Sequence, residues 1–257
     1  MLGINLDLVL VPTGILFMVG YHIYLVYRII KHPNSTVIGF ENGNRRVWVQ
    51  QMMENMPSNT GLALQVVASN ISAAVYLVSL SITLSSLIGT LVGASTSSGS
   101  TATNKGLVNV IIFGDKSAVT ASIKYVSLLI CFLIAFMSHV QCIRYYIHVS
   151  FLISTPRSSV PADYIENSVI RGSNFWSLGL RAYYFAFPLL LWIFGPIPMF
   201  VCVLGLISTL YFLDSTVNPI PPFAVKSSSK GMADIGRGIE SNAGRNQCSL
   251  GGLLEFQ

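Results

Sequence analysis

The sequence predicts an all-α integral membrane protein, built as a bundle of about four transmembrane helices. Hydrophobic residues make up 52% of the 257-residue chain and charged residues only 10%, whereas an ordinary soluble domain carries about 25% charged residues. The mean hydropathy is strongly positive, at +0.63. A surface that faces lipid needs no cover of charged side chains, so this composition indicates the membrane class.

Four apolar stretches are each long enough to cross the hydrocarbon core, which takes about 20 helical residues. We expect spans at about residues 8–30, 70–92, 125–143 and 188–213, within a membrane domain that covers residues 1–214. After this domain the chain reads Asn-Pro-Ile-Pro-Pro and continues with Ser, Gly and isolated charges. Residues 215–257 are therefore predicted to be a disordered tail.

The fourth apolar run is longer than one span needs, and Gly195, Pro196 and Pro198 lie near its middle. Each proline removes a backbone hydrogen bond that a continuous helix would make. Two interpretations stay open: a single span with a proline kink, or a re-entrant pair whose broken backbone protein must bury.

The first loop contains a segment with helical periodicity, residues 45–56. Val49, Met52, Met53 and Met56 recur there at helical spacing, with Trp48 beside them. This pattern predicts an interfacial helix, with a soluble core helix as the alternative.

The basic residues are dispersed, and the net charge is +5. Because they form no basic tract, a nucleic-acid partner is not expected. They gather instead in the first and third loops: Arg28, Lys31, Arg45, Arg46, Arg144, Arg157, Arg171 and Arg181. The positive-inside rule then places both loops in the cytosol and the N-terminus outside. Four spans would put the basic tail outside as well, whereas a re-entrant fourth segment would return it to the cytosol.

Known catalytic and metal-binding patterns are absent from the sequence. It contains no HExxH, GxSxG, Walker or Gly-rich dinucleotide motif and no CxxC pair, so we expect no enzyme, metal or cofactor. The four cysteines are interpreted as apolar filler. Asp7 and Asp214 lie at the edges of the spans, which weakens the case for a proton-coupled or cation-coupled transporter.

Polar side chains from three helices are predicted to meet at the cytosolic leaflet. On helical wheels they form one face of each helix, whereas His22 points elsewhere. The candidate cluster comprises Tyr24, Arg28, Gln141, Arg144, His148, Asn174, Arg181 and Tyr184. Arginines in such a cluster bind an anion or a lipid headgroup bidentately; alternatively, they only snorkel to the headgroups, beside tyrosines of an aromatic belt. We expect Arg181 to face Arg144 and Arg28.

Four motifs carry a resemblance to a known family. They are GYHIYLVYRI (20–29), TVIGFENGNRRVWV (36–49), SHVQCIRYYIHVSFLI (138–153) and RGSNFWSLGLRAYYFAFPLLLWIFGPIPM (171–199). Together they resemble the family catalogued as domain of unknown function 599, over roughly residues 6–214. Its members are predicted multi-pass membrane proteins of plants and bacteria. The resemblance thus implies a membrane location and no established activity.

These observations predict a non-enzymatic multi-pass membrane protein that acts through lipid or protein contacts. Membrane lipids are the expected partners, and a homo-oligomer is left open. A small transporter or channel for an unidentified solute is the alternative function. We expect the plasma membrane or an endomembrane of a plant cell as its location.

Overall fold

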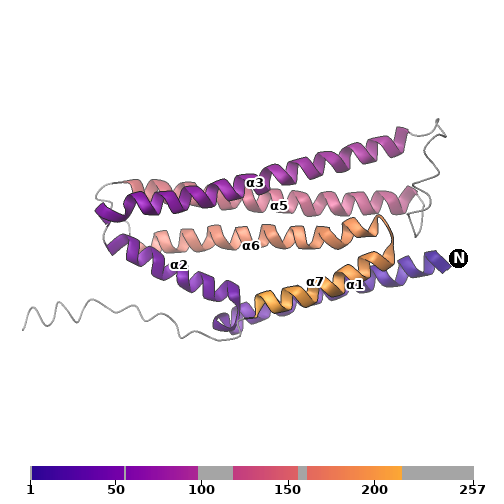
Figure 1. Ribbon diagram of the computed structural model, residues 1–257, viewed down its shortest axis with the longest axis horizontal. Helices are drawn as coiled ribbons and strands as arrows, with labels where there is room; N and C mark the ends of the chain where they lie inside the picture. Colours follow the sequence, from indigo (N-terminus) through magenta and orange to yellow (C-terminus); the bar gives the residue numbers. More distant parts are fainter. Residues whose placement is uncertain (1, 55, 98–117, 156–160, 216–257) are drawn as a thin grey trace, which may run out of the picture. The chain divides into compact units, whose positions relative to one another are not determined.

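The computed structural model describes residues 2–54, 56–97, 118–155 and 161–215, and these residues are almost entirely helical. The elements are α1 (Leu2–Lys31), the short 3-10 helix η1 (Pro33–Ser35), α2 (Val37–Glu54), α3 (Met56–Ser97), α5 (Ala118–Ser154), α6 (Ala162–Trp192) and α7 (Pro196–Asp214) (Figure 1). Within the described ranges, β-structure is limited to an isolated bridge between Thr36 and Ser215. The predicted all-α class is confirmed. The predicted tail lies outside the described residues, apart from Ser215.

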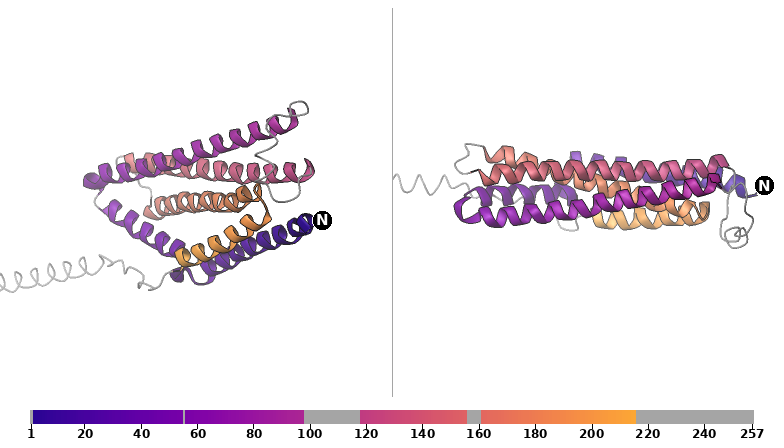
Figure 2. Two further views of the ribbon diagram at one scale, coloured as in Figure 1. Left: turned by 45° about the vertical axis from the view of Figure 1, so that its right-hand side comes forward. Right: turned by 90° about the horizontal axis from the view of Figure 1, so that it is seen from above.

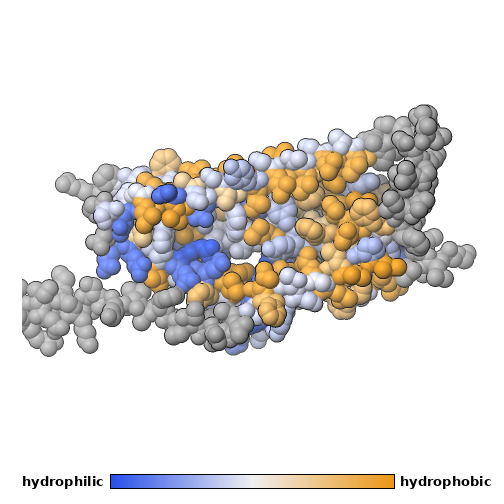
Figure 3. All heavy atoms as spheres, viewed as in Figure 1, coloured by the Kyte–Doolittle hydropathy of each residue, from blue (hydrophilic) through white to orange (hydrophobic). Residues whose placement is uncertain are grey.

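Four helices in the described part of the chain are long and apolar enough to cross a membrane. They cover Asp7–Lys31, Ser58–Val92, Val119–Ser154 and Pro196–Asp214. The protein is therefore a membrane protein. The second and third of these segments, with 35 and 36 residues, would each be about 50 Å long, which exceeds the hydrocarbon core of about 30 Å. Hydrophilic residues gather around the end of the bundle that carries α2 (Figure 3).

The helices α3, α5 and α6 pack side by side, and α7 lies along α1 (Figures 1 and 2). Two clusters of buried side chains hold this arrangement together. The cluster nearer α2 contains Val49, Ala63, Val67, Ala74, Cys142, Tyr146, Val149, Ile153, Ile165 and Val169. The cluster at the other end contains Val11, Ile88, Leu128, Phe132, Ala186, Leu189, Trp192 and Met199. The C-terminal half of α6 is therefore packed among the membrane-spanning helices.

Close packing of α5 on α6 depends on a glycine. A Cβ atom at Gly179 would come within 2.3 Å of Cε1 of His139, whose side chain is fully buried. The His139 ring lies between Trp176 and Tyr183, with ring-centroid distances of 5.6 and 5.8 Å. Its Nδ1–H donates to the carbonyl of Ala135 at 2.7 Å. The imidazole therefore fills the space that a side chain at position 179 would need.

The chain reverses between α6 and α7. Gly195 adopts φ 157° and ψ 170°, a region that is essentially restricted to glycine. Pro196 and Pro198 occupy the first turn of α7, where a missing N–H costs no helix hydrogen bond. The prolines therefore start a new helix. The structure has no single helix over residues 188–213: α6 ends at Trp192, and α7 begins at Pro196 and returns antiparallel to α6 (Figure 1). By length and composition α7 could cross a membrane by itself.

Helix α2 begins earlier than the predicted segment and ends before Met56, which belongs to α3. Val49 is 1% exposed and packs in the cluster nearer α2. The Nε of Arg46 pairs with Glu166 of α6 at 3.1 Å, and the Gln50 amide donates to the same carboxylate at 3.4 Å. These contacts attach α2 to the N-terminal part of α6.

At the opposite end of the bundle, Trp192 joins α6 to two other helices. Its indole Nε1–H donates to Oδ1 of Asp7 in α1 at 3.1 Å. The ammonium group of Lys124 in α5 lies over the indole ring, 5.2 Å from its centroid. The carboxylate at the start of the first span is therefore buried against α6.

Candidate functional site

A cavity of about 640 Å³ opens between α1 and α6, with further walls from α2 and α5. Its apolar wall residues are Leu25, Val26, Ile29, Ile38, Cys131, Ile134, Leu178, Ala182 and Phe185. Its polar wall residues are His22, Asn42, Asn174, Ser177 and Arg181. The volume falls within the range of about 300–1,000 Å³ that is typical of ligand sites. The cavity is thus large enough for a ligand and has polar groups on otherwise apolar walls.

Three buried polar atoms at this cavity have no hydrogen-bond partner among the described residues. They are Nε2 of His22, Oδ1 of Asn42 and Nη1 of Arg181. The other ring nitrogen of His22, Nδ1, donates to the carbonyl of Met18 at 2.8 Å, so Nε2 is an acceptor in the neutral ring. The amide nitrogen of Asn42 donates to Oδ1 of Asn174 at 3.1 Å, which leaves its own oxygen as an acceptor. The residues that line the cavity therefore carry two acceptors and one donor that are buried and unpaired.

The charge of Arg181 is balanced within the protein. Its Nη2 forms a salt bridge with Oδ1 of Asp214, and the two side chains are 14% and 9% exposed. The phenol of Tyr21 in α1 donates to the other oxygen of Asp214 at 2.6 Å. The guanidinium also lies over the ring of Tyr184, 5.6 Å from its centroid. The polar end of the cavity is therefore close to electrically neutral.

Next to the ion pair of Arg181 and Asp214, Arg28 joins the end of α1 to the end of α7. Its Nη1 donates to Oγ of Ser215 at 3.1 Å, and its Nη2 donates to the carbonyl of Ser35 at 3.1 Å. The guanidinium lies 5.9 Å from the ring centroid of Tyr24. The bridge between Thr36 and Ser215 lies at the same place. The residue after α7 is therefore fixed beside the first loop.

The structure divides the predicted cluster. Arg181, which lies over Tyr184, pairs with Asp214. Arg28, which lies over Tyr24, donates to Ser215, the next residue in the chain. These four predicted residues are therefore brought close together. Asn174 lines the cavity.

The three residues predicted from α5 are not among those that line the cavity. Arg144 and His148 are exposed, and Gln141 is partly exposed. Nε2 of His148 forms a hydrogen bond with the hydroxyl of Tyr164 at 3.2 Å. Arg181 does turn inward, but the group that it meets is the carboxylate of Asp214 rather than Arg144.

The predicted cluster did not include three residues of this site: His22, Asn42 and Asp214. One signal for Asp214 was present, because a carboxylate in the last turn of a helix opposes the helix dipole and favours a nearby cation. For His22 the helical wheel was informative: the ring points away from Arg28, and the structure shows that this other face lines the cavity.

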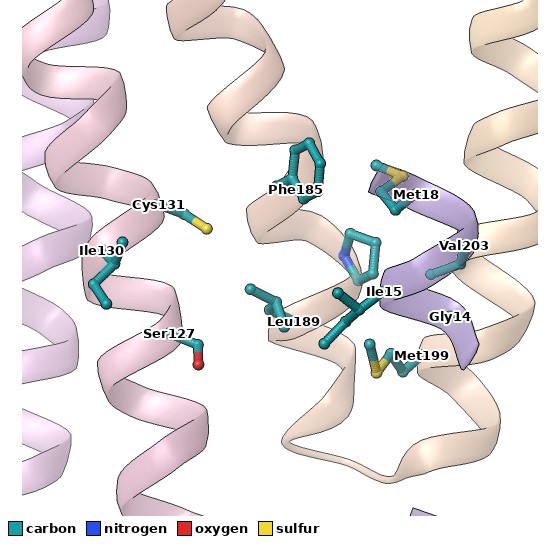
Figure 4. A pocket seen from close by; sticks show the side chains of 11 residues that line it. Gly14, Ile15, Met18, Ser127, Ile130, Cys131, Phe185, Leu189, Met199 and Val203 are labelled. Carbon is teal, nitrogen blue, oxygen red and sulfur yellow. The ribbon is translucent and has the colours of Figure 1, made fainter. Parts of the chain in front are cut away.

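A second cavity of about 230 Å³ lies farther from α2 and is almost wholly apolar. Cys131 and Phe185 line both cavities. Figure 4 shows Phe185 and Leu189 of α6 facing Met18 and Ile15 of α1 across this second space. Phe185 therefore stands between a cavity with a polar end and one without.

Among the residues that the structure describes, no group of three or more His, Cys, Asp or Glu side chains is placed to hold a metal ion. The polar atoms of the first cavity are those of amide, imidazole, hydroxyl and guanidinium groups. These groups suit a ligand that is recognised by hydrogen bonds.

A comparison with family models matches residues 9–219 to the family described as "Protein of unknown function, DUF599". Comparisons with curated proteins and with solved structures found no match. The matched range includes both cavities and the pair between Arg181 and Asp214. The chain therefore belongs to the DUF599 family of proteins of unknown function.

Proposed function

We propose that this protein is a non-enzymatic membrane protein that binds a membrane lipid in the cavity between α1 and α6. The observation that carries the proposal is the composition of this cavity. Nine of its wall residues are apolar, yet three of its polar wall residues, His22, Asn42 and Arg181, each carry a buried polar atom that has no partner among the described residues. A molecule that satisfies both features has a polar head and a hydrocarbon chain.

The position of the cavity supports a lipid as the occupant. Its walls come partly from α1 and α5, which contain two of the segments long and apolar enough to span a bilayer. Within the hydrocarbon region of a bilayer, an unpaired polar group gains roughly several kcal/mol from a hydrogen-bond partner. A lipid supplies the chain and the partner in one molecule.

A binding role is better supported than catalysis because the charged groups beside the cavity engage one another. Asp214 accepts hydrogen bonds from Tyr21 and Arg181, which makes its carboxylate a poor general base. Cys131 is the thiol in the cavity wall, and a nucleophilic thiol requires an adjacent base or cation. The groups around the cavity are thus arranged to hold a molecule.

The proposal is tested by filling the cavity from two sides. Ser177→Phe places a ring into it from α6, and Val26→Trp does so from α1. Val201→Trp is the matched control, because Val201 is 63% exposed on α7 and lines neither cavity. Each full-length variant is purified from membranes, its folding is checked by thermal melting, and its retained lipid is measured by native mass spectrometry.

We expect wild type and Val201→Trp to retain the same lipid, and both cavity-filling variants to lose most of it. Equal retention in all four proteins would show that the retained lipid lies elsewhere, and the proposal would fail.

A further inference from the structure

We infer that the cavity selects a lipid with an uncharged headgroup that carries several hydroxyls, such as a single sugar. This inference rests on the proposed lipid-binding function and adds the chemical class of the headgroup. It follows from three properties of the polar wall, by which we mean the polar residues that line the cavity: His22, Asn42, Asn174, Ser177 and Arg181. These properties are its charge, its hydrogen-bonding character and its length.

The charge of the site favours an uncharged headgroup. Arg181 already has Asp214 as its counter-ion, and Tyr21 also donates to that carboxylate. An anionic headgroup would therefore bring a second negative charge next to Asp214, in a setting of low dielectric where like charges repel strongly. The remaining Nη1 of Arg181 is buried and has no partner among the described residues, and a neutral oxygen that reaches it would satisfy this donor without adding a charge.

The hydrogen-bonding character favours hydroxyls over phosphate. Nε2 of His22 and Oδ1 of Asn42 are acceptors, whereas Nη1 of Arg181 is a donor. An ionised phosphate only accepts hydrogen bonds, so it would leave both acceptors unpaired. A hydroxyl donates and accepts, and a set of hydroxyls can therefore serve all three atoms.

The length of the polar wall favours several hydroxyls over one. Asn174, Ser177 and Arg181 all line the cavity from α6, and seven residues of helix extend over about 10 Å. Asn42 lies at the Asn174 end, to which it is hydrogen-bonded. A single hydroxyl cannot reach along this wall, whereas a sugar ring with its linker can.

The apolar part of the cavity accommodates the hydrocarbon. Leu25, Val26 and Ile29 face it from α1. Beyond Phe185 the smaller cavity adds almost wholly apolar wall, including Ile15 and Met199. An acyl chain that starts at the polar residues therefore meets apolar wall in the first cavity, and a shift of the Phe185 side chain would extend that wall into the second cavity.

The inference is tested with three probes that share the same acyl chains: glucosyl-diacylglycerol, diacylglycerol and phosphatidate. The full-length protein is placed in phosphatidylcholine nanodiscs doped with each probe. Bound lipid is then measured by native mass spectrometry at pH 8, where histidine with its ordinary pKa of about 6.5 is neutral. We expect glucosyl-diacylglycerol to bind several-fold more strongly than either of the other two.

Two variants remove the acceptors. His22→Phe keeps an aromatic ring against Phe185, whose centroid lies 4.6 Å from that of His22, and Asn42→Leu keeps the size of the side chain. Each is expected to reduce the preference for the glucosyl lipid about 2- to 10-fold, the effect of one lost hydrogen bond, and to leave diacylglycerol binding unchanged. His148→Phe, at an exposed histidine outside the cavity wall, is the control and should change nothing.

Two results would overturn the headgroup class while leaving the lipid-binding function intact. Stronger binding of phosphatidate would identify an anion site. Equal binding of glucosyl-diacylglycerol and diacylglycerol would show that the polar wall does not distinguish between lipid headgroups. If no probe binds above the phosphatidylcholine background and Ser177→Phe has no effect on retained lipid, the proposed function itself fails.

Discussion

Asp214, the last residue of α7, forms a buried ion pair with Arg181 of α6, which precedes it by 33 positions in the chain. The carbonyl groups at the end of a helix disfavour a negative charge, so Asp214 depends on a cation supplied by another element. Tyr21 adds a hydrogen bond from α1. Three helices are thereby joined at one carboxylate.

Asp214→Asn should destabilise the protein by about 3–5 kcal/mol, because it leaves the Arg181 guanidinium buried without a counter-charge. The free energy of unfolding in detergent is the measurement. Arg144→Gln is the control: Arg144 is exposed, and its replacement should change that free energy by less than about 0.5 kcal/mol.

The double variant Arg181→Gln/Asp214→Asn should recover part of this loss, since neither charge is then unpaired. A double variant that loses the sum of the two single effects would show that the two side chains do not interact.

Gly179→Ala should be strongly destabilising, because the added methyl would approach the ring of the buried His139 to 2.3 Å. Relief requires α5 and α6 to separate, and overpacking of this kind costs about 1–3 kcal/mol or more. Gly205→Ala is the matched control on α7, where a Cβ would meet nothing within 4 Å. Thermal melting of both variants should show a lower midpoint only for Gly179→Ala. Similar midpoints would mean that the helices are not this close.

Gly195→Ala should weaken the reversal between α6 and α7, since φ 157° is unfavourable for any residue with a Cβ. Such strain costs about 1–3 kcal/mol. Gly89→Ala, at a helical position in α3 where a Cβ would meet nothing within 4 Å, should instead be neutral or stabilising. The measurement is the free energy of unfolding of each alanine variant. A Gly195→Ala variant as stable as wild type would argue against this backbone conformation.

Labelling of single cysteines should place residues 46 and 215 on one side of the membrane and residue 119 on the other. Ser215 contacts Arg28 and Thr36 at the end of the bundle where α2 begins, whereas Val119 lies at the start of α5 and is 69% exposed. The background carries serine in place of Cys131, Cys142, Cys202 and Cys248. Impermeant reagent applied to intact cells should label Val119→Cys and spare Arg46→Cys and Ser215→Cys. Labelling of Ser215→Cys and Val119→Cys from the same side, with Arg46→Cys on the other, would contradict the reversal at Gly195.

Hydropathy was sufficient to predict the helical membrane class, because length and apolar composition determine whether a helix can cross lipid. The fourth run was ambiguous for a physical reason. Proline is found both at kinks inside helices, where it removes a backbone hydrogen bond, and in the first turn of a new helix, where no such bond is lost. Its presence alone therefore did not distinguish the two interpretations. The φ angle of Gly195 separates the two, and it depends on how α7 packs along α1.

The candidate site was predictable only in part for a related reason. The wheel of α6 correctly grouped Asn174 with Arg181, which both line the cavity. A wheel does not reveal which neighbour a face will meet, so the polar face of α5 with Arg144 and His148 was assigned to the same cluster. The partner of Arg181 could not be inferred either, because Asp214 reaches it only after the chain has reversed.

The hairpin of α6 and α7 has a consequence for biosynthesis. α6 is not among the described helices that are apolar enough to cross a membrane by composition, yet Ala186, Leu189 and Trp192 pack among the spanning helices. A helix of this kind is a poor substrate for the translocon when it arrives alone. We therefore expect α6 to enter the bilayer together with α7, because Asp214 of α7 neutralises Arg181. A chain that ends after Trp192 should accordingly integrate α6 less efficiently than a chain that continues through Asp214.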